Sequence, residues 1–142
     1  MQPSPKTRER STQAVVDFCR ELMACLHMDL EPDGKEEEGV IHINLTGADR
    51  AFLLSNAASL LNNIEYLLNK VFHLGKNDAH GIVLDSDQYR QHREAELVLL
   101  ATMASEKVIS LHKSLNLQPM IPRERRIVHL ALAGIEGVRT ES

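Results

Sequence analysis

An amphipathic stretch that begins at Pro122 is the feature that most restricts how this chain can fold. Proline suits the first position of a helix, because its missing N–H would have no partner there. At about 100° per residue, the residues that follow separate into an apolar and a basic face. The sequence therefore predicts a helix that packs through its apolar face, which consists of Ile127, Val128, Ala131, Leu132 and Ile135. Glu124 lies at the edge of that face, in the first turn.

The opposite face of this helix is basic and carries Arg123, Arg125, Arg126 and His129, with Leu130 among them. Arg125 and His129 are one helical turn apart, so their side chains project next to each other. A guanidinium beside an imidazole can bind a phosphate or the edge of a nucleotide. On these residues alone, a solvated basic surface is the simpler interpretation.

Composition and charge limit the classes of function. A chain of 142 residues has room for one ordinary domain or two small ones, and an aromatic content of 4% means that its cores must be aliphatic. The net charge of −4 argues against broad electrostatic binding of nucleic acid. Residues 1–84 contain 12 acidic and 8 basic side chains, whereas residues 85–142 contain 8 of each. The second part is therefore balanced, and its arginines are clustered.

The sequence holds no recognisable targeting, metal-binding or catalytic motif. Cys19 and Cys25 suit one helix face, so we expect both to be reduced, buried and inert, which is consistent with a cytoplasmic location. No apolar run reaches the length of a membrane span, and residues 1–10 are expected to be a flexible leader. The seven histidines form no cluster at ligand spacing, and no nucleophile is recognisably activated. Neither a metal, a cofactor nor an enzymatic activity is predicted.

Periodicity predicts mixed helices and strands in residues 11–84. Ser11 or Thr12 can cap a first helix, whose apolar positions are Val15, Phe18, Cys19, Leu22, Cys25 and Leu26. The acidic stretch Pro32–Gly39 is typical of a turn or loop, with a weak strand around Met28–Leu30 before it. Ile41, Ile43 and Leu45 then alternate with polar residues, which predicts a half-buried strand with His42 facing outward. A second helix, a polar loop at Gly75–Gly81 and a strand at Gly81–Asp85 follow; the core-facing positions of that helix are Leu60, Leu61, Ile64, Leu67, Leu68, Val71 and Phe72.

Residues 85–142 are predicted to hold a long helix from Ser86 or Asp87, the helix at Pro122 and two short strands. Alternation places the strands at Ser114–Gln118 and Val138–Thr140. The inward positions of the long helix are Tyr89, Leu97, Leu100, Ala101, Ala104, Val108 and Leu111.

The spacing Arg-x-x-x-His at Arg125 and His129 is the signature of the R-three-H domain, a small module that binds single-stranded nucleic acid. The chain resembles the bacterial Jag (SpoIIIJ-associated) family, also at Ile64–Asn69, Asp85–Arg93, Pro119–Met120 and Gly137–Ser142. The resemblance implies an α+β fold of two small domains. A KH-like, type II-like domain with a three-stranded sheet is expected at 11–84, and an R-three-H domain at 85–142. The second domain would place helices on a small sheet whose last strand is missing from this sequence, leaving one sheet edge unpaired.

One element of the implied KH-like domain departs from the family pattern. A binding-competent KH domain has a Gly-x-x-Gly loop ahead of its central helix, where the nucleic-acid backbone approaches closely. Here the equivalent positions are Ser55-Asn56-Ala57-Ala58, without glycine, Lys or Arg. We expect a degenerate KH fold that acts as a scaffold, with Ser55 and Asn56 serving as helix caps.

Nucleic-acid binding is the first functional hypothesis. On it, the chain binds single-stranded RNA or DNA, with RNA favoured by the resemblance. Arg125 would contact phosphate and His129 a sugar or base, while Arg123 and Arg126 would add electrostatic attraction. The resemblance also implies a role in the control of cell-envelope growth and an indirect link to the membrane insertase.

A protein-interaction adaptor of the same fold is the alternative. Its contact surfaces, for a partner or a second copy, would be the KH-like domain and the open sheet edge. Arg90 and Arg93, at the start of the long helix, either extend the basic surface or form an ordinary solvated first turn.

Overall fold

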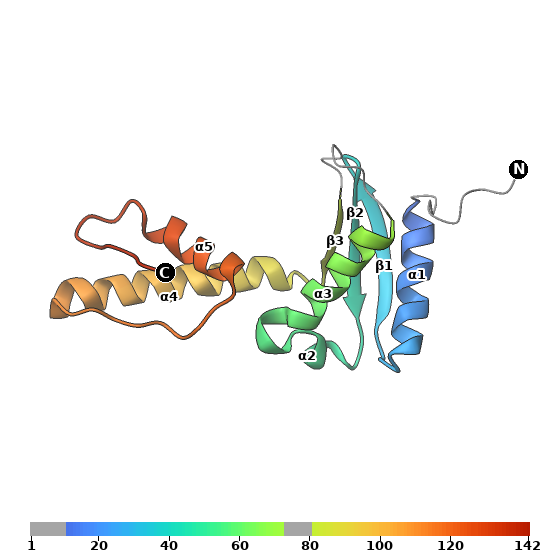
Figure 1. The fold of residues 1–142 in the computed structure, drawn as a ribbon, viewed down its shortest axis with the longest axis horizontal. Coiled ribbons are helices and arrows are strands. Elements are labelled where there is room, and N and C mark those ends of the chain that lie inside the picture. Colours follow the sequence, from blue (N-terminus) through green and yellow to red (C-terminus); the bar gives the residue numbers. More distant parts are fainter. Residues whose placement is uncertain (1–10, 73–80) are drawn as a thin grey trace, which may run out of the picture. The chain divides into compact units, whose positions relative to one another are not determined.

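The computed structural model describes residues 11–72 and 81–142 (Figure 1). The chain divides into two compact units, and the boundary lies between Asp87 and Gln88. The sequence suggested a division slightly earlier, before Asp85. The expected leader at 1–10 and most of the expected loop, residues 75–80, lie outside the described residues. The predicted α+β class is confirmed, because a three-stranded sheet with helices makes up the first unit and a pair of helices the second.

The first unit is built around strand β2, which lies at the centre of the sheet. It pairs antiparallel with β1 and parallel with β3. In chain order the elements are α1 (Thr12–Cys25), β1 (Glu31–Glu37), β2 (Val40–Thr46), α2 (Arg50–Leu53), α3 (Ser55–Val71) and β3 (Ile82–Asp85).

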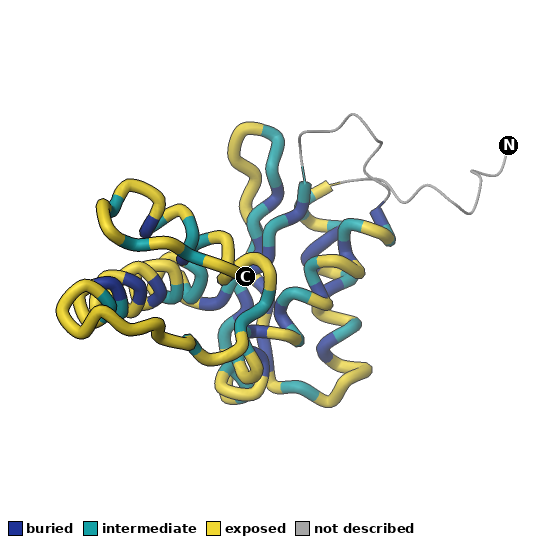
Figure 2. The backbone as a smooth tube through the Cα atoms, turned by 60° about the vertical axis from the view of Figure 1, so that its left-hand side comes forward, coloured by how far each residue is buried: buried dark blue, intermediate teal, exposed yellow. Residues whose placement is uncertain are grey.

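One face of this sheet carries the core. Ile41 and Ile43 of β2 lie beside Ile82 and Leu84 of β3, and all four are buried. Helices α1 and α3 pack on the sheet and meet through the edge-to-face rings of Phe18 and Phe72, whose centroids are 5.7 Å apart. The alternation of buried and intermediate positions along β2 and β3 can be followed in Figure 2. His42 is half-buried on the other face, as predicted.

The acidic segment predicted to be a loop is instead an edge strand. Strand β1 pairs with β2 from Glu31 to Glu37, and only Glu38 and Gly39 form the turn, both with positive φ (51° and 80°). Helix α1 packs closely on this strand, because a Cβ on Gly34 would lie only 2.5 Å from Cγ2 of Val16. The prediction failed because the strand is stabilised through its backbone while most of its charged side chains face solvent.

Helix α1 begins as predicted and buries a different stripe. The Ser11 hydroxyl accepts a hydrogen bond from the Ala14 amide at 3.1 Å. The prediction of two buried cysteines is correct for Cys19 and wrong for Cys25, which is exposed because the buried stripe runs through Val15, Val16, Cys19 and Met23. Burial raises the pKa of the Cys19 thiol to about 11, which keeps it protonated and unreactive.

The junction between α2 and α3, residues 55–58, has an unusual backbone. Asn56, Ala57 and Ala58 all adopt left-handed conformations, with φ of 52°, 57° and 58°. The Ser55 hydroxyl donates to the Phe52 carbonyl at 2.7 Å, and α3 begins without a side-chain cap, so the predicted capping by Ser55 and Asn56 is wrong. A left-handed conformation costs roughly 1–2 kcal/mol for a residue with a Cβ. The junction therefore adopts a backbone suited to glycine without containing one.

The outer edge of β3 is covered by side chains of α3. The side-chain amide of Asn69 donates to the backbone carbonyl of Ile82 and accepts from the backbone N–H of Ile82, each at 2.9 Å. The Leu84 amide donates to a Glu65 carboxylate oxygen at 3.0 Å. These two side chains thus take the positions that the backbone of a further strand would occupy.

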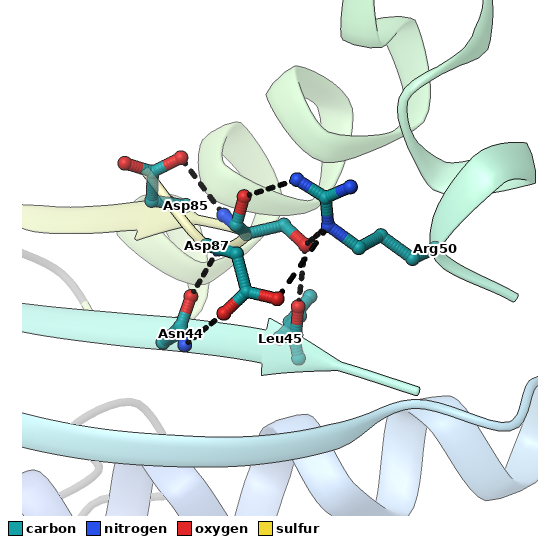
Figure 3. A network of polar contacts seen from close by, with 6 residues as sticks. Asn44, Leu45, Arg50, Asp85 and Asp87 are labelled. Carbon is teal, nitrogen blue, oxygen red and sulfur yellow. Dashed lines mark hydrogen bonds and ion pairs between the residues drawn. The ribbon is translucent and has the colours of Figure 1, made fainter. Parts of the chain in front are cut away.

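A polar network holds the end of β3 (Figure 3). The buried Ser86 hydroxyl donates to the Leu45 carbonyl at 2.6 Å and accepts from Nε of Arg50 at 3.0 Å. A terminal guanidinium nitrogen of Arg50 also donates to the Ser86 carbonyl at 3.0 Å. One residue further on, the Asp87 amide donates to the Asn44 side chain at 2.8 Å. The chain is therefore fixed to β2 and α2 immediately before the second unit begins.

The second unit is a pair of packed helices, α4 (Tyr89–Leu111) and α5 (Pro122–Leu132). Helix α5 begins at Pro122, as predicted. The shared core contains Leu97 and Ala101 of α4 together with Val128 and Leu132 of α5. The predicted inward positions Leu100 and Leu111 are wrong, since both are exposed.

The small sheet expected in this unit does not form in residues 88–142. Segments 114–118 and 138–140 contain no strand, and Leu115 is exposed. Leu117 and Val138 instead pack against the helical core. The predicted strands fail because Leu117 and Val138 contact the helical core in place of a neighbouring strand. The unpaired sheet edge proposed as a contact surface is therefore absent from this unit.

We expect Ala57→Gly to raise the free energy of unfolding of the first unit by up to about 1 kcal/mol, because glycine adopts a left-handed φ without a Cβ clash. Native-state hydrogen exchange of the β2 amides measures this quantity. The control Ala24→Gly, at an ordinary helical position near the end of α1, should lower it by about 0.5 kcal/mol. Equal losses for both variants would contradict the strain at the junction.

Ser86→Ala should lower the same free energy by about 1–3 kcal/mol, because the Leu45 carbonyl loses its donor and Arg50 loses an acceptor in a buried place. Ser110→Ala, at an exposed position of α4, is the matched control and should change stability by less than about 0.5 kcal/mol. Protection of β2 and β3 amides equal to that of the unsubstituted protein would show that the network is dispensable.

Candidate nucleic-acid interface

An open groove of about 1040 Å³ lies within the second unit. Its walls are the C-terminal half of α4, the segment from His112 to Met120, one side of α5 and residues 136–142. Apolar side chains from all four segments lie in it: Val108, Leu117, Val128, Leu132 and Val138. The groove thus offers an apolar surface mainly through Val108, Leu117 and Val138, because Val128 and Leu132 are themselves almost fully buried.

Basic side chains surround this apolar surface. The groove is lined by two histidines, one lysine and two arginines, from three different segments: His112, Lys113, Arg125, His129 and Arg139. Glu136 and Glu141 are the acidic side chains on the same lining. Of these, Glu141 pairs with Arg139 at 2.9 Å, with both side chains exposed to solvent, so this ion pair is weak and readily exchanged. The groove therefore combines apolar contact with positive charge.

Arg125 lies at the first turn of α5, where its side chain faces the groove lining. One terminal nitrogen of its guanidinium donates to the Met120 carbonyl at 2.9 Å, which holds the side chain beside the chain segment that leads into the helix. Among the residues that the structure describes, no ion pair joins Arg125 to a carboxylate. Its remaining donors are therefore available to an anion.

His129 lies one turn further along α5 and is half-buried. Its Nδ1 is 2.6 Å from Oγ1 of Thr140, and both residues line the groove. The sequence-predicted pair Arg125 and His129 is therefore brought to one wall of the same groove by the helical spacing that identified it.

The other four predicted site residues lie elsewhere. Arg123 and Arg126 are exposed on α5 and do not line the groove, and Arg90 lies in the first turn of α4. Arg93 makes two hydrogen bonds to the buried Glu124 carboxylate, at 2.9 and 3.4 Å, and one to Glu96 at 3.2 Å. The hydrogen bond to Glu124 raises the pKa of Arg93 above its ordinary value. Arg93 thus joins the beginnings of α4 and α5.

Three basic groove residues and one threonine were not identified from sequence: His112, Lys113, Arg139 and Thr140. They lie outside the helices and follow no period that links them to α5. The family resemblance at Gly137–Ser142 marked the segment that contains two of them without indicating that it faces His129. Their position depends on how the two connecting segments cross the helical pair.

Comparison with known proteins identifies the second unit. The family model for the R-three-H domain matches residues 95–142, which include most of α4, all of α5 and the groove residues. In the described parts of the chain, no helix has the length and apolar character needed to cross a membrane.

Relatives named RNA-binding protein KhpB match most of the chain. The protein from Clostridium symbiosum is 30% identical over 139 residues, which covers 96% of this chain and 63% of the relative. The protein from Bacillus subtilis (strain 168) is 28% identical over 100 residues, covering 70% of this chain and 48% of the relative. That from Lactiplantibacillus plantarum is 27% identical over 135 residues, covering 94% and 42%. The chain thus spans between 42% and 63% of the length of these relatives.

Glu124→Gln should lower the stability of the second unit by about 1–2 kcal/mol, because it removes the charge that pairs with Arg93. The loss stays below that of a fully buried pair, since 34% of the Arg93 side chain remains exposed. Thermal unfolding and exchange of α5 amides measure it. Glu106→Gln, on the exposed side of α4, is the matched control. An equal loss of stability in both variants would contradict a stabilising role of the Arg93–Glu124 pair.

Proposed function

The chain belongs to the Jag family and carries an R-three-H domain, and we propose that it binds single-stranded RNA through the groove of its second unit. The observation that carries this proposal is the placement of Arg125 and His129 on one wall of a groove that also contains Lys113 and Arg139. Four basic side chains from three segments can contact successive oxygens of a sugar–phosphate backbone.

The predicted site residues fall into three groups in this proposal, according to whether they contact the ligand, attract it or hold the helices together. Arg125 makes a charge-assisted contact with phosphate, and His129 contacts a sugar or base. Arg123 and Arg126 lie outside the groove and add long-range attraction, as does Arg90. Arg93 contributes mainly by holding α4 to α5, because Glu124 compensates its charge. Lys113 and Arg139 join the site as further phosphate-binding residues.

The choice of single-stranded RNA has two supports. The relatives bear the name RNA-binding protein, and an apolar groove wall can receive only a base that is not already stacked in a duplex. Among the described residues, no Tyr, Trp or Phe lines the groove to act as a stacking platform. Affinity should therefore be modest and fall steeply with salt concentration.

The first unit acts as a KH-like scaffold in this proposal, since the junction at 55–58 offers neither glycine nor positive charge. The proposal also includes a cytoplasmic location and no enzymatic activity. A link to cell-envelope growth and to the membrane insertase follows from the family resemblance and belongs to the proposal.

A protein-interaction adaptor is the second candidate. The observation that favours it is a group of exposed apolar side chains on α4, with Leu99, Leu100 and Met103 exposed by 62%, 44% and 52%. Apolar surface of this kind is more typical of a protein contact than of a nucleic-acid interface.

Fluorescence anisotropy with a labelled single-stranded RNA tests the proposal. We expect salt-sensitive binding that Arg125→Ala and His129→Ala each weaken roughly tenfold, which corresponds to about 1.4 kcal/mol. Arg125→Ala should also reduce the salt dependence by about one counterion, because a phosphate contact is lost.

The matched control is Lys107→Ala, which removes one positive charge from α4 outside the groove and should change affinity by less than about twofold. Absence of binding at low salt, or an equal loss in the control, would contradict RNA binding in the groove and favour the adaptor.

A further inference from the structure

The side chain of Thr140 forms a hydrogen bond with the imidazole of His129 at the wall of the groove. We propose that Thr140 is a positioning residue: it fixes the ring of His129 so that Nε2, carrying its proton, points toward bound nucleic acid. The inference rests on the proposed function of the groove and adds how its histidine is held in the binding-competent state.

The geometry leaves one ring nitrogen for a ligand. Nδ1 of His129 is 2.6 Å from Oγ1 of Thr140, a distance typical of a strong hydrogen bond. Nε2 lies on the other side of the five-membered ring and has no hydrogen-bond partner among the described residues. Rotation about the bond that joins the ring to Cβ is otherwise soft, so a single hydrogen bond can select the ring orientation.

The hydroxyl of Thr140 can donate to Nδ1 or accept from it, and the proposal assigns the arrangement in which it donates. A threonine hydroxyl can donate to an unprotonated Nδ1, which places the ring proton on Nε2. An Nε2–H group is a donor, and the acceptors of a nucleic acid within reach of a groove wall are oxygens of phosphate, ribose and base. The assigned tautomer is therefore the one that complements the ligand, as with histidines whose second nitrogen is fixed in metal sites.

Thr140 is itself anchored. Val138 packs against the helical core, and Thr140 is half-buried, whereas Arg139 and Glu141 are exposed and pair with each other. The alternation directs the threonine toward α5 and the charged pair toward solvent. The segment thus holds the hydroxyl against the imidazole without using the charges that flank it.

Nitrogen chemical shifts of the His129 ring test the positioning without any ligand. They are recorded at alkaline pH, where imidazoles are neutral and the two tautomers differ in shift. We expect one tautomer, protonated on Nε2, in the unsubstituted protein and in Thr140→Ser, which keeps the hydroxyl. Thr140→Val keeps the shape and should give a mixture. A ring protonated on Nδ1, or unchanged shifts in Thr140→Val, would overturn the proposal.

Binding of single-stranded RNA by anisotropy supplies the second readout. Thr140→Val should weaken binding about three- to tenfold, and Thr140→Ser should stay within about twofold. In a His129→Ala background, Thr140→Val should have no further effect, because the threonine acts through the ring. An equal loss in both backgrounds would show that Thr140 acts independently of His129.

The two experiments separate the two proposals. If the unsubstituted protein binds no RNA, the proposed function fails, while the ring shifts still decide whether Thr140 positions His129. If RNA binds but the shifts and the double-substitution cycle show no coupling, the positioning role fails and the function stands.

Discussion

The packing of α5 on α4 is the interaction on which the candidate site depends. Its core is small and aliphatic, and the alanine at Ala101 lets the two helices approach closely where Val128 and Leu132 meet Leu97. The Arg93–Glu124 pair fixes the beginnings of the helices, so that rotation of α5 about its axis is opposed there as well as by the apolar contacts further along. Because Arg125 and His129 lie beside the buried Val128 and Leu132 on α5, the packing that buries those two residues also determines where the basic side chains point.

The chain is acidic as a whole, but basic side chains are concentrated in the groove of the second unit. With a net charge of −4, long-range attraction of a polyanion is weak, and the first unit contributes an acidic edge strand. The groove gathers cationic side chains that lie far apart in the sequence around an apolar floor. Such an arrangement favours short-range contacts over nonspecific adhesion.

Sequence reasoning succeeded where one element contains its own signal. Helix α5 has a proline at its start and an apolar stripe, so its first residue and its packed face followed from the sequence, although the predicted stripe continued to Ile135, beyond the last helical residue, Leu132. Strand β1 was missed because its stability comes from backbone pairing and from the close approach of α1 at Gly34, neither of which produces an apolar pattern. The ion pair between Arg93 and Glu124 and the hydrogen bond between His129 and Thr140 each join residues that are far apart in the sequence. No local period predicts such contacts, so only the three-dimensional structure identifies them.

The side chains that cover the outer edge of β3 bear on the tendency of the protein to aggregate. An uncovered strand edge is a template on which another chain can add and from which aggregates grow. Asn69 and Glu65 occupy the donors and acceptors at this edge as soon as α3 docks on the sheet. At the opposite edge, Pro32 removes one backbone donor and the acidic side chains of β1 repel copies of themselves. Docking of α3 on the sheet thus protects the outer edge of β3 from pairing with a strand of another chain.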